Sequence, residues 1–473
     1  MMRSLYSAVS GLKTHQTRMD VIGNNIANVN TEGFKSSSVT FSELMYQTTS
    51  KATSGSGANG IGGVNAKQIG LGVSTGSTTV SITSAGSAET TGNPFDLKLT
   101  DSQTTNFFVV SDGTNTMFTR AGSFYVDGNG YLCMSSTGYK LMGWQVDQTT
   151  GDIRKDTVSS LQIMSAANQT SPPEATTKAY VSGILDKNDK DVATNDGYVL
   201  ALTFFDDLGY SYTAKFAVKE VMNNGAKVDG AYSISLSDIL DTNGASIMYD
   251  KNGNLLAGVN PAAIFTPTTI NYDTSDGTFA GIAGNAANTT LNLTLSHSPA
   301  FNTGGPDANG IYDSQFKDIT IDFSSSLNYN NGGTSTYSAT RGDEANGDGA
   351  GKKVGALIGL TVNSDGRIYG SYDNGNTTLL CQIACAQFAN ASGLEKIGEN
   401  CYKSTLNSGE FDGVGVEISA DGSSMSTGEL EMSNVDLSSE FTGMIVTQRG
   451  FQANSRVITT SDTLLEELIN LKR

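Results

Sequence analysis

The stretch "MDVIGNNIANVNTEGFK", from Met19 to Lys35, is the part of this chain from which its fold is most directly inferred. It continues a run with helical apolar spacing, and it holds four asparagines within seven residues: Asn24, Asn25, Asn28 and Asn30. Asparagine is a poor helix former, because its amide competes for nearby backbone groups. A helix built for stability alone would not accumulate such residues, so these amides are expected to serve another purpose.

Both ends of the chain carry the apolar spacing of amphipathic helices. Near the N-terminus the apolar positions fall in steps of three, four and seven, with His15 or Gln16 in the gap: Leu5, Val9, Leu12, Met19, Ile22 and Ile26. Near the C-terminus one column recurs every seven residues: Met444, Phe451, Ile458 and Leu465. Its companion column is largely polar: Leu437, Phe441, Gln448, Ser455, Asp462 and Ile469. The pattern predicts two helices with seams close to a heptad repeat, the first of them stopping at Gly33.

Between these ends the periodicity changes from helical to alternating. The segment "NFFVVSDGTNTMFTRAGSFYVDGNGYLCM", from residue 106, alternates aromatic or β-branched residues with polar ones and contains Asp-Gly and Asn-Gly turns. Such a pattern predicts hairpins. "YVLALTFFDDLGYSYTAKFAVKE", from residue 198, and "GLTVNSDGRIYGSYDNGNTTLL", from residue 359, are β-like in the same way. The Gly- and Ser-rich stretch 51–63 is typical of a flexible connector.

The composition restricts the partners of the chain. It is acidic, with 47 Asp+Glu against 29 Lys+Arg and a net charge of -18, and it is long enough, at 473 residues, for two or more domains. The charges of residues 1–35 and 430–473 cancel, so the whole surplus lies between them. A negative surface argues against binding nucleic acid or an anionic membrane. No apolar run approaches the roughly 20 residues that span a bilayer, and "MMRSLYSAVSGLK" does not resemble a cleaved signal peptide.

The sequence offers little from which to build a catalytic or metal site. A serine–histidine–aspartate triad would need His15 or His297, and both are better explained as surface or packing residues. The four cysteines form no C-x-x-C pair: Cys133, Cys381, Cys385 and Cys401. Buried thiols are favoured over zinc ligands, although a pairing of Cys401 with another thiol stays open. The turns at Asp127 and Asp250 lack the glycine and glutamate of a calcium loop. We therefore expect no enzyme, metal or cofactor.

The two helical ends are expected to pair and then to need further neighbours. Burying one apolar side chain gains about 1.5–3 kcal/mol, whereas ordering one residue of backbone costs about 1–2 kcal/mol. A two-helix hairpin with a half-polar seam is therefore marginal, and other copies of the chain are the obvious source of more contacts. In that arrangement Asn24, Asn25 and Asn28 would connect subunits through uncharged amides. The alternative is a frayed helix end in which the asparagines only cap and turn.

Two motifs at opposite ends of the chain resemble a known family. "MDVIGNNIANVNTEGFK" resembles the N-terminal signature of bacterial flagellar rod and hook proteins. "GELEMSNVDLSSEFTGMIVTQRGFQANSRVITTSDTLLEELINLKR" resembles their C-terminal signature, and "FTRAGSFYVDGNGYL", "LMGW", "SYDNG" and "ANASGLEKIGENCYKSTLNSG" are also similar to the family. The middle, 180–335, matches only weakly. The length and this large middle segment are closer to hook proteins than to the shorter rod proteins.

The resemblance implies an α+β multidomain fold. The terminal helices would pair as a coiled-coil-like inner domain, and two outer all-β domains would be nested by insertion. The implied division is an inner helical domain of 1–40 and 430–473, a connector of 41–75, a β-rich middle domain of 76–179 and 336–429, and an inserted outer β domain of 180–335.

The implied function is that of a structural subunit of the bacterial flagellar hook. It would self-assemble into a curved flexible tube that transmits motor torque from rod to filament. The implied partners are other copies of itself, the distal rod, hook cap and hook–filament junction proteins, and the flagellar type III export apparatus, without nucleic acid or membrane insertion. The residues expected to carry self-assembly are the apolar seam positions given above together with Asn24, Asn25 and Asn28. A distal rod subunit and a secreted β-sandwich adhesin are the alternatives.

Overall fold

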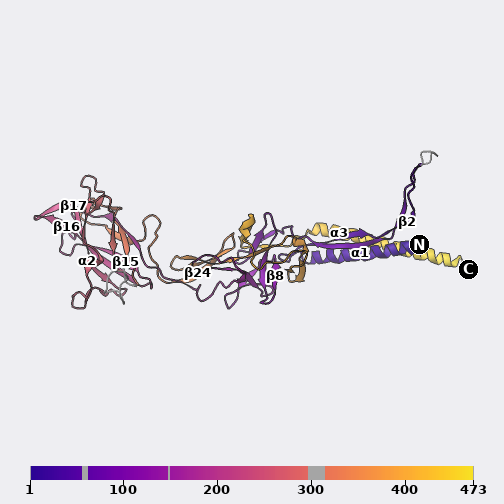
Figure 1. Ribbon diagram of the computed structural model, residues 1–473, viewed down its shortest axis with the longest axis horizontal. Coiled ribbons are helices and arrows are strands. Elements are labelled where there is room, and N and C mark those ends of the chain that lie inside the picture. The colour runs from indigo at the N-terminus through magenta and orange to yellow at the C-terminus, as the bar shows by residue number, and fades with distance from the viewer. Residues whose placement is uncertain (1, 56–61, 148–149, 297–314, 472–473) are drawn as a thin grey trace. The chain divides into compact units, whose positions relative to one another are not determined.

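The computed structural model describes residues 2–55, 62–147, 150–296 and 315–471 (Figure 1). The chain forms two compact units. Unit 1 comprises Met1–Asn168, Gly359–Gly370 and Thr378–Arg473, and unit 2 comprises Gln169–Ile358 and Ser371–Thr377. A helix lies at each end and the body between them is mainly β, which confirms the predicted α+β class. The finer division into domains, with boundaries at residues 41, 76, 180 and 336, stays a prediction.

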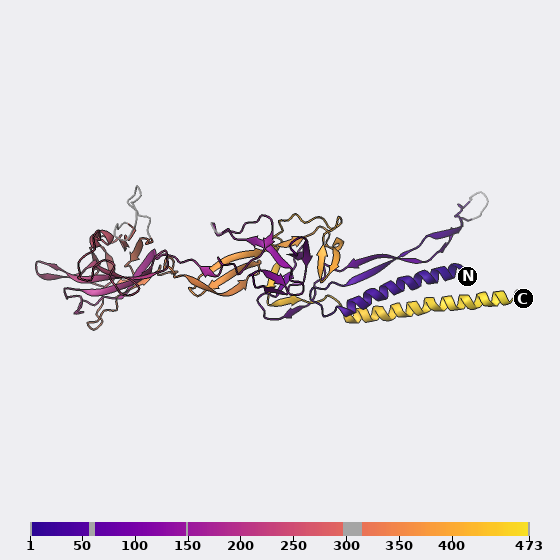
Figure 2. The same cartoon turned by 90° about the horizontal axis from the view of Figure 1, so that it is seen from below.

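The two long helices are α1, Met2–Ala27, and α3, Leu437–Asn470. They lie side by side in both views (Figures 1 and 2). They run antiparallel, because Gly11 of α1 lies beside Asn454 and Ile22 lies beside Gly443. Asp436 caps the start of α3 by accepting hydrogen bonds from the next backbone N–H groups. The end of α1 was expected at Gly33, but the helix stops six residues earlier, where the amide of Asn28 turns back to bond the helix.

A two-stranded ladder follows α1 and packs against it. It pairs β1, Ser37–Glu43, with β4, Val73–Val80, and continues as a hairpin of β2, Tyr46–Ser50, and β3, Lys67–Gly70. The backbone N–H of Val73 donates to the hydroxyl of Ser10, 3.2 Å away, and Phe41 meets His15 edge to face. The segment 41–75, predicted to be a connector, is therefore largely strand where the structure describes it. Its β-branched and hydroxyl residues suit a pleated ladder.

The β body of unit 1 is an antiparallel sheet whose central order is β26-β11-β7-β8-β29-β28. Its core includes Phe108, Phe124 and Met425, and the first two rings meet edge to face. The hairpins predicted from residue 106 and from residue 359 are confirmed. The strands of this body are β5 Ala88–Thr90, β6 Leu97–Thr100, β7 Asn106–Ser111, β8 Thr116–Thr119, β9 Phe124–Val126, β10 Leu132–Met134, β11 Lys140–Gln145, β12 Ser159–Ser160, β27 Cys385–Gln387, β28 Glu395–Gly398, β29 Cys401–Lys403, β30 Ser424–Thr427 and β31 Glu429–Glu431, with short 3₁₀ turns at Ala391–Gly393 and Ile418–Asp421. The chain passes between the units through β24 Gly355–Val362, β25 Arg367–Tyr372 and β26 Thr377–Ile383.

Unit 2 is built on two sheets that share one apolar core. The first is an antiparallel meander, β15-β16-β17-β18-β19, in which the strands predicted from residue 198 form the first hairpin. The second has the order β20-β21-β14-β22, with β23 beside β14. Phe204, Phe216 and Tyr232 are among the buried side chains between them. The elements are β13 Thr170–Ser171, β14 Lys178–Ile184, β15 Tyr198–Phe205, β16 Ser211–Asn223, β17 Ala226–Leu240, α2 Pro261–Ile264, β18 Thr268–Tyr272, β19 Phe279–Ile282, β20 Thr290–Leu293, β21 Ile319–Asp322, β22 Ser326–Leu327 and β23 Ser338–Arg341.

Candidate functional site

The fully buried positions of α1 and α3 are mainly small or polar residues. The buried positions of α1 are Ala8, Gly11, Thr14, Ile22 and Asn25, and those of α3 are Thr447 and Ser461. Small side chains let two helix backbones approach closely, so this face allows a tight antiparallel pair with little apolar area. We call α1 and α3 together the terminal helix pair.

The structure brings only part of the predicted seam to this contact. On α1, Ile22 is buried, Val9 is exposed, and the remaining positions are half-buried: Leu5, Leu12, Met19 and Ile26. On α3, the first predicted column is half-buried at Met444, Ile458 and Leu465, while Phe451 remains 38% exposed.

The second predicted column of α3 is wrong as a contact with α1. Its apolar members Leu437, Phe441 and Ile469 are exposed, and only Ser455 in that column is half-buried. The column one residue earlier faces α1 instead: Glu440, Thr447, Asn454 and Ser461. The glycines at 443 and 450 flank this polar column, so the helix turns the side of closest backbone approach inward.

The side chain of Asn25 joins three elements of one chain through hydrogen bonds, an arrangement that we call the clasp. This side chain is 1% exposed, and its Nδ2 donates to Oε1 of Glu440 and to the carbonyl oxygen of Ser37, each at 2.8 Å. Its Oδ1 accepts from the backbone N–H of Ser37 at 3.0 Å. The amide therefore joins α1 to the start of α3 and to the first residue of β1. Sequence spacing alone could not reveal these partners, because Glu440 lies at the other end of the chain.

The neighbouring asparagines behave differently from Asn25. The Nδ2 of Asn28 donates to the carbonyl of Asn24 at 2.9 Å, and its Oδ1 accepts from the Thr31 hydroxyl. This is the local turn chemistry that was the alternative for all of them. The side chain of Asn24 is exposed on the surface of α1. Of the three predicted connectors, Asn24 is thus the one whose amide faces solvent in a single chain.

A large part of the apolar surface of α3 is uncovered. Beyond the residues that face α1, the exposed apolar side chains of this helix are Leu437, Phe441, Ile445, Val446, Phe451, Val457, Leu464, Leu468 and Ile469. The C-terminal turns of α3 also extend past the start of α1 (Figure 2). Exposed apolar side chains on a helix that is already covered on one side are typical of a surface that binds a partner.

The chain leaving α1 docks onto the β body at a junction formed by residues 31–35. Gly33 has a φ of 64°, and a Cβ there would lie 2.6 Å from the backbone nitrogen of Ala121. Its own N–H donates to the carbonyl of Glu431 at 2.7 Å. Lys396 donates to the carbonyl of Lys35, also at 2.7 Å. Gly33 is therefore required by a left-handed backbone and a close approach, and not as the helix stop that its position suggested.

A buried ionic cluster lies beneath this junction and was not found from the sequence. Lys35 Nζ is 2.7 Å from Glu431 Oε1, and the guanidinium of Arg120 is 2.9 Å from Glu431 Oε2. Arg120 also contacts Asp101 at 2.8 Å and donates to the carbonyl of Asn106. The side chains of Lys35, Glu431 and Arg120 are each about 1% exposed. The cluster joins the N-terminal signature, the β body and the C-terminal signature in one network.

The electrostatics of the cluster favour the ion pairs. Burial by itself raises the pKa of the Glu431 carboxyl, but the charges of Arg120 and Lys35 outweigh burial and hold that pKa below its ordinary value. Burial lowers the pKa of Lys35, and the charge of Glu431 opposes this. Removing one member of such a buried set would leave the others charged and unpaired, which is strongly destabilising.

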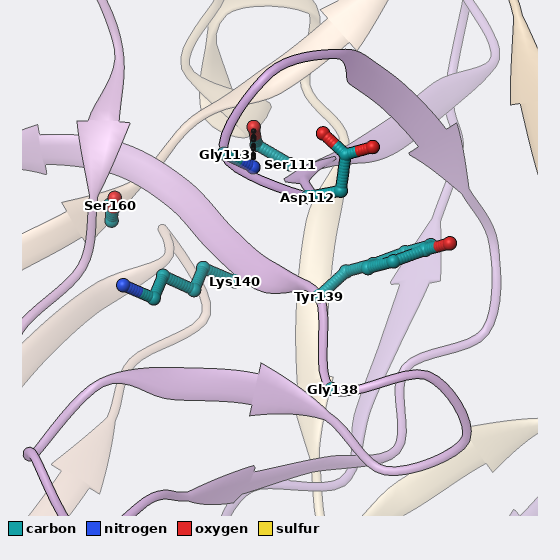
Figure 3. A pocket seen from close by; sticks show the side chains of 7 residues that line it. All are labelled: Ser111, Asp112, Gly113, Gly138, Tyr139, Lys140 and Ser160. Atoms are coloured by element: carbon teal, nitrogen blue, oxygen red, sulfur yellow. Dashed lines mark hydrogen bonds between the residues drawn. The ribbon is translucent and has the colours of Figure 1, made fainter.

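One pocket of unit 1 and the four cysteines have structural explanations. A pocket of about 210 Å³ in unit 1 is lined by Asp112 and Lys140, among others, and Figure 3 shows these two pointing in different directions. The Asp112 carboxylate accepts the backbone N–H groups of Thr114 and Asn115, so it is committed to its turn. The four cysteines are buried free thiols, as expected for packing residues, and burial raises the pKa of Cys381 to about 12.

The histidines, possible metal ligands and possible membrane-spanning helices were also considered in the sequence. His15 is half-buried on α1, whereas His297 lies outside the described residues. Within residues 2–55, 62–147, 150–296 and 315–471, His, Cys, Asp and Glu side chains nowhere gather in the threes that a metal ion needs. Over the same residues, neither α1 nor α3 nor any shorter helix combines the length and apolarity needed to cross a bilayer.

Family models match three segments of the chain. Residues 5–35 match the flagella basal body rod protein model, and residues 103–171 match the flagellar hook protein FlgE/F/G D1 domain. Residues 426–471 match the C-terminal model of the flagellar basal body rod FlgEFG protein. These segments include both terminal signatures and the strands around Arg120.

Full-length relatives extend the likeness to the whole chain. The flagellar hook protein FlgE of Treponema pallidum is 34% identical, and that of Borreliella burgdorferi is 33% identical, each over 100% of both chains. The flagellar basal-body rod protein FlgG of Bacillus subtilis is 28% identical, also over 100% of both chains. A crystal structure of Helicobacter pylori flagellar hook protein FlgE2 aligns with a TM-score of 0.38 at 13% identity, covering 71% of this chain and 98% of that one.

Proposed function

The chain belongs to the family of flagellar hook proteins, which makes it a structural subunit of the bacterial flagellar hook, and we propose that it builds the hook by polymerising through its terminal helix pair. The family is one of structural proteins and not of enzymes. In this proposal the product is a curved, flexible tube that carries motor torque from rod to filament.

The observation that carries the proposal is the uncovered apolar face of α3. Residues such as Ile445, Val457 and Leu464 are exposed in one chain, although burying each would gain about 1.5–3 kcal/mol. Copies of the same chain are the natural cover, because α1 and α3 carry little net charge while the acidic surplus lies between residues 35 and 430. The predicted self-assembly residues Phe441, Phe451 and Ile469 would then face neighbouring subunits.

The nested domain layout belongs to this proposal. The ends 1–40 and 430–473 would form a coiled-coil-like inner domain of the tube. The segments 76–179 with 336–429, and then 180–335, would form β domains farther out. A polar and acidic outer surface suits contacts that must be exchanged reversibly while the tube bends.

The junction formed by residues 31–35 would transmit torque between the helices and the β body. The ionic cluster of Lys35, Glu431 and Arg120 supports this role, since it ties both helix-proximal segments to one sheet through charge-assisted hydrogen bonds. Loads applied to α1 or α3 would reach the β body through this cluster.

The partners and the route of the chain follow from the same proposal. The subunit would contact the distal rod at one end of the tube and the hook cap or hook–filament junction proteins at the other. It would leave the cell through the flagellar type III export apparatus without a cleaved signal and act outside the cell. Nucleic acid and membrane insertion play no part.

Electron microscopy of the polymer formed by the purified chain tests the proposal. A curved tube is the expected result. The rod relative of Bacillus subtilis makes a distal rod subunit the second candidate, and a straight rigid rod would favour that function. If the chain stayed monomeric under all assembly conditions, the proposed polymerisation through the terminal helix pair would be overturned.

A further inference from the structure

Two contacts between α1 and α3 are reciprocal. A Cβ placed on Gly11 of α1 would lie 2.7 Å from Nδ2 of Asn454, and one placed on Gly450 of α3 would lie 2.7 Å from Cε1 of His15. Real Cβ atoms do not approach other atoms so closely, so each helix uses a missing side chain to admit a polar side chain of the other. On both helices the glycine precedes the inserted side chain by four residues, or about one turn.

The position of the His15 ring is fixed by packing. The ring lies against Gly450 of α3 and meets the ring of Phe41 on β1 edge to face, with centroids 5.9 Å apart. Its Nδ1 is buried without a hydrogen-bond partner among the described residues. Packing against two other elements therefore holds the ring, and a change in helix alignment would remove that packing.

We infer that Gly11, His15, Gly450 and Asn454 form a lock that fixes the axial register of α1 against α3. This inference rests on the proposed function, since it concerns the helix pair through which the chain would polymerise. A shift of one turn would place His15 against Val446 or Asn454, both of which carry side chains. A shift of one heptad would place His15 at Gly443, but would move Gly11 from Asn454 to Thr447. Only the observed register satisfies both pairs.

The lock determines what a second copy of the chain encounters. With Gly11 beside Asn454 in an antiparallel pair, the start of α1 reaches only as far as residues near Thr463. Leu464 and Leu468 then belong to a part of α3 without cover from its own chain, as Figure 2 shows for the end of the helix. A different register would lengthen or shorten this uncovered end, so the four residues of the lock select how much of α3 is left for docking.

Four glycine-to-alanine variants of the full chain test the lock. Alanine raises helix propensity at every one of these positions. Gly11→Ala and Gly450→Ala would nevertheless force the side chains of Asn454 and His15 out of their positions between the helices. The matched controls have room, because a Cβ at Gly23 meets nothing within 4 Å and one at Gly443 meets only Ile22 at 3.4 Å. Tubes of the first two variants should depolymerise at a lower temperature than wild type, and tubes of the two controls at the same temperature or higher.

Compensating changes separate the lock from general damage. Asn454→Ala in the Gly11→Ala chain, and His15→Ala in the Gly450→Ala chain, make room for the added methyl and should recover part of the lost thermal stability. If Gly11→Ala and Gly450→Ala tubes matched the two controls, the lock would be overturned. If wild type formed no tubes, the proposed function would fail, and helix melting of the same variants by circular dichroism would still decide whether the lock exists.

Discussion

The side-chain amide of Asn25 donates a hydrogen bond to the carboxylate of Glu440 across 2.8 Å, which ties the first helix of the chain to the last over 415 positions of sequence. The same amide exchanges two hydrogen bonds with the backbone of Ser37. An asparagine that weakens a helix on propensity alone here satisfies three groups that meet where α1, α3 and β1 converge. The amides in the N-terminal signature therefore have different uses at neighbouring positions.

Asn25→Ala should weaken the terminal helix pair even though it raises helix propensity. It leaves the half-buried groups of Glu440 and Ser37 without the Asn25 amide as a partner, at about 1–3 kcal/mol each. Asn24→Ala, which changes an exposed amide on the same helix, is the matched control and should stabilise the isolated chain slightly. The measurements are the thermal unfolding of the helices in the chain and the depolymerisation temperature of the tubes. Tubes that are weakened by Asn24→Ala would identify Asn24 as an intersubunit connector, whereas unchanged unfolding of Asn25→Ala would contradict the clasp.

Glu431→Gln should destabilise unit 1 by about 3–5 kcal/mol, because it leaves Lys35 and Arg120 with buried charge. Glu429→Gln is a control on the same strand. Its partner Lys98 is 3.8 Å away and both side chains are partly exposed, so that change should cost about 0–1 kcal/mol. Chemical denaturation of the two variants gives the comparison. Equal losses would show that the cluster adds nothing beyond an ordinary surface ion pair.

The stability of the terminal helix pair should fall in mild acid. Burial and the charge of Arg18 lower the pKa of His15 below its ordinary value near 6.5. The unfolded chain then binds the proton more readily than the folded one, so stability is full above about pH 6.5, falls as the pH drops toward the lowered pKa, and levels off below it. The two other elements that contact His15 also carry charge nearby in the sequence. Arg449 is next to Gly450 on α3, and Glu43 lies two residues after Phe41 on β1.

The measurement for this pH dependence is the depolymerisation temperature of tubes between pH 5 and 7.5, with His15→Gln as the control. The depolymerisation temperature of wild-type tubes should fall as the pH drops through this range, and that of His15→Gln tubes should not show this fall. A fall of the same size in both proteins would assign it to another group, and the role of His15 would be rejected.

Charge on the exposed apolar face of α3 should prevent polymerisation while the chain still folds. Ile445→Asp and Val457→Asp each place a carboxylate on a surface that would be buried between subunits. Thr463→Asp is the control, because Arg449, Arg456, Thr463 and Asn470 form a polar column of the same helix. Sedimentation and electron microscopy would report assembly, and circular dichroism would report the fold. Tubes of normal length from Ile445→Asp and Val457→Asp would remove this face from the interface.

The final turns of α3 should exchange their amide hydrogens fast in the monomer and slowly in the polymer. Residues from Leu464 to Asn470 extend past α1 in the single chain, so their helix lacks tertiary support. Residues 440–461, which pack against α1, serve as the internal reference within the same helix. Hydrogen exchange followed by mass spectrometry can compare the two segments, and equal protection of the end in monomer and polymer would mean that it is stable without a neighbour.

Much of the fold could be predicted from local sequence patterns. The spacing of Leu5, Leu12 and Met19 predicts α1, and the seven-residue repeat from Met444 predicts α3, because helix periodicity is written in consecutive residues. The Asp-Gly and Asn-Gly turns predict the hairpins from residues 106 and 359 for the same reason, and the β-like pattern from residue 198 predicts strands there. The terminal signatures were sufficient to identify the family resemblance, and therefore the hook.

The tertiary structure alone decided which side of α3 faces α1 and which residues meet at the junction. Apolar periodicity favoured Phe441 and Ile469, but the closest approach of two backbones is governed by glycines, and these turn the polar column of Thr447 and Asn454 inward. Lys35 and Glu431 look like unrelated charges in the sequence, since nothing local links two residues nearly 400 positions apart. Their pairing requires the sheet of Arg120 to bring both chain ends together. A buried charge network is thus fixed by the assembled fold, whereas helices and hairpins follow from short-range preference.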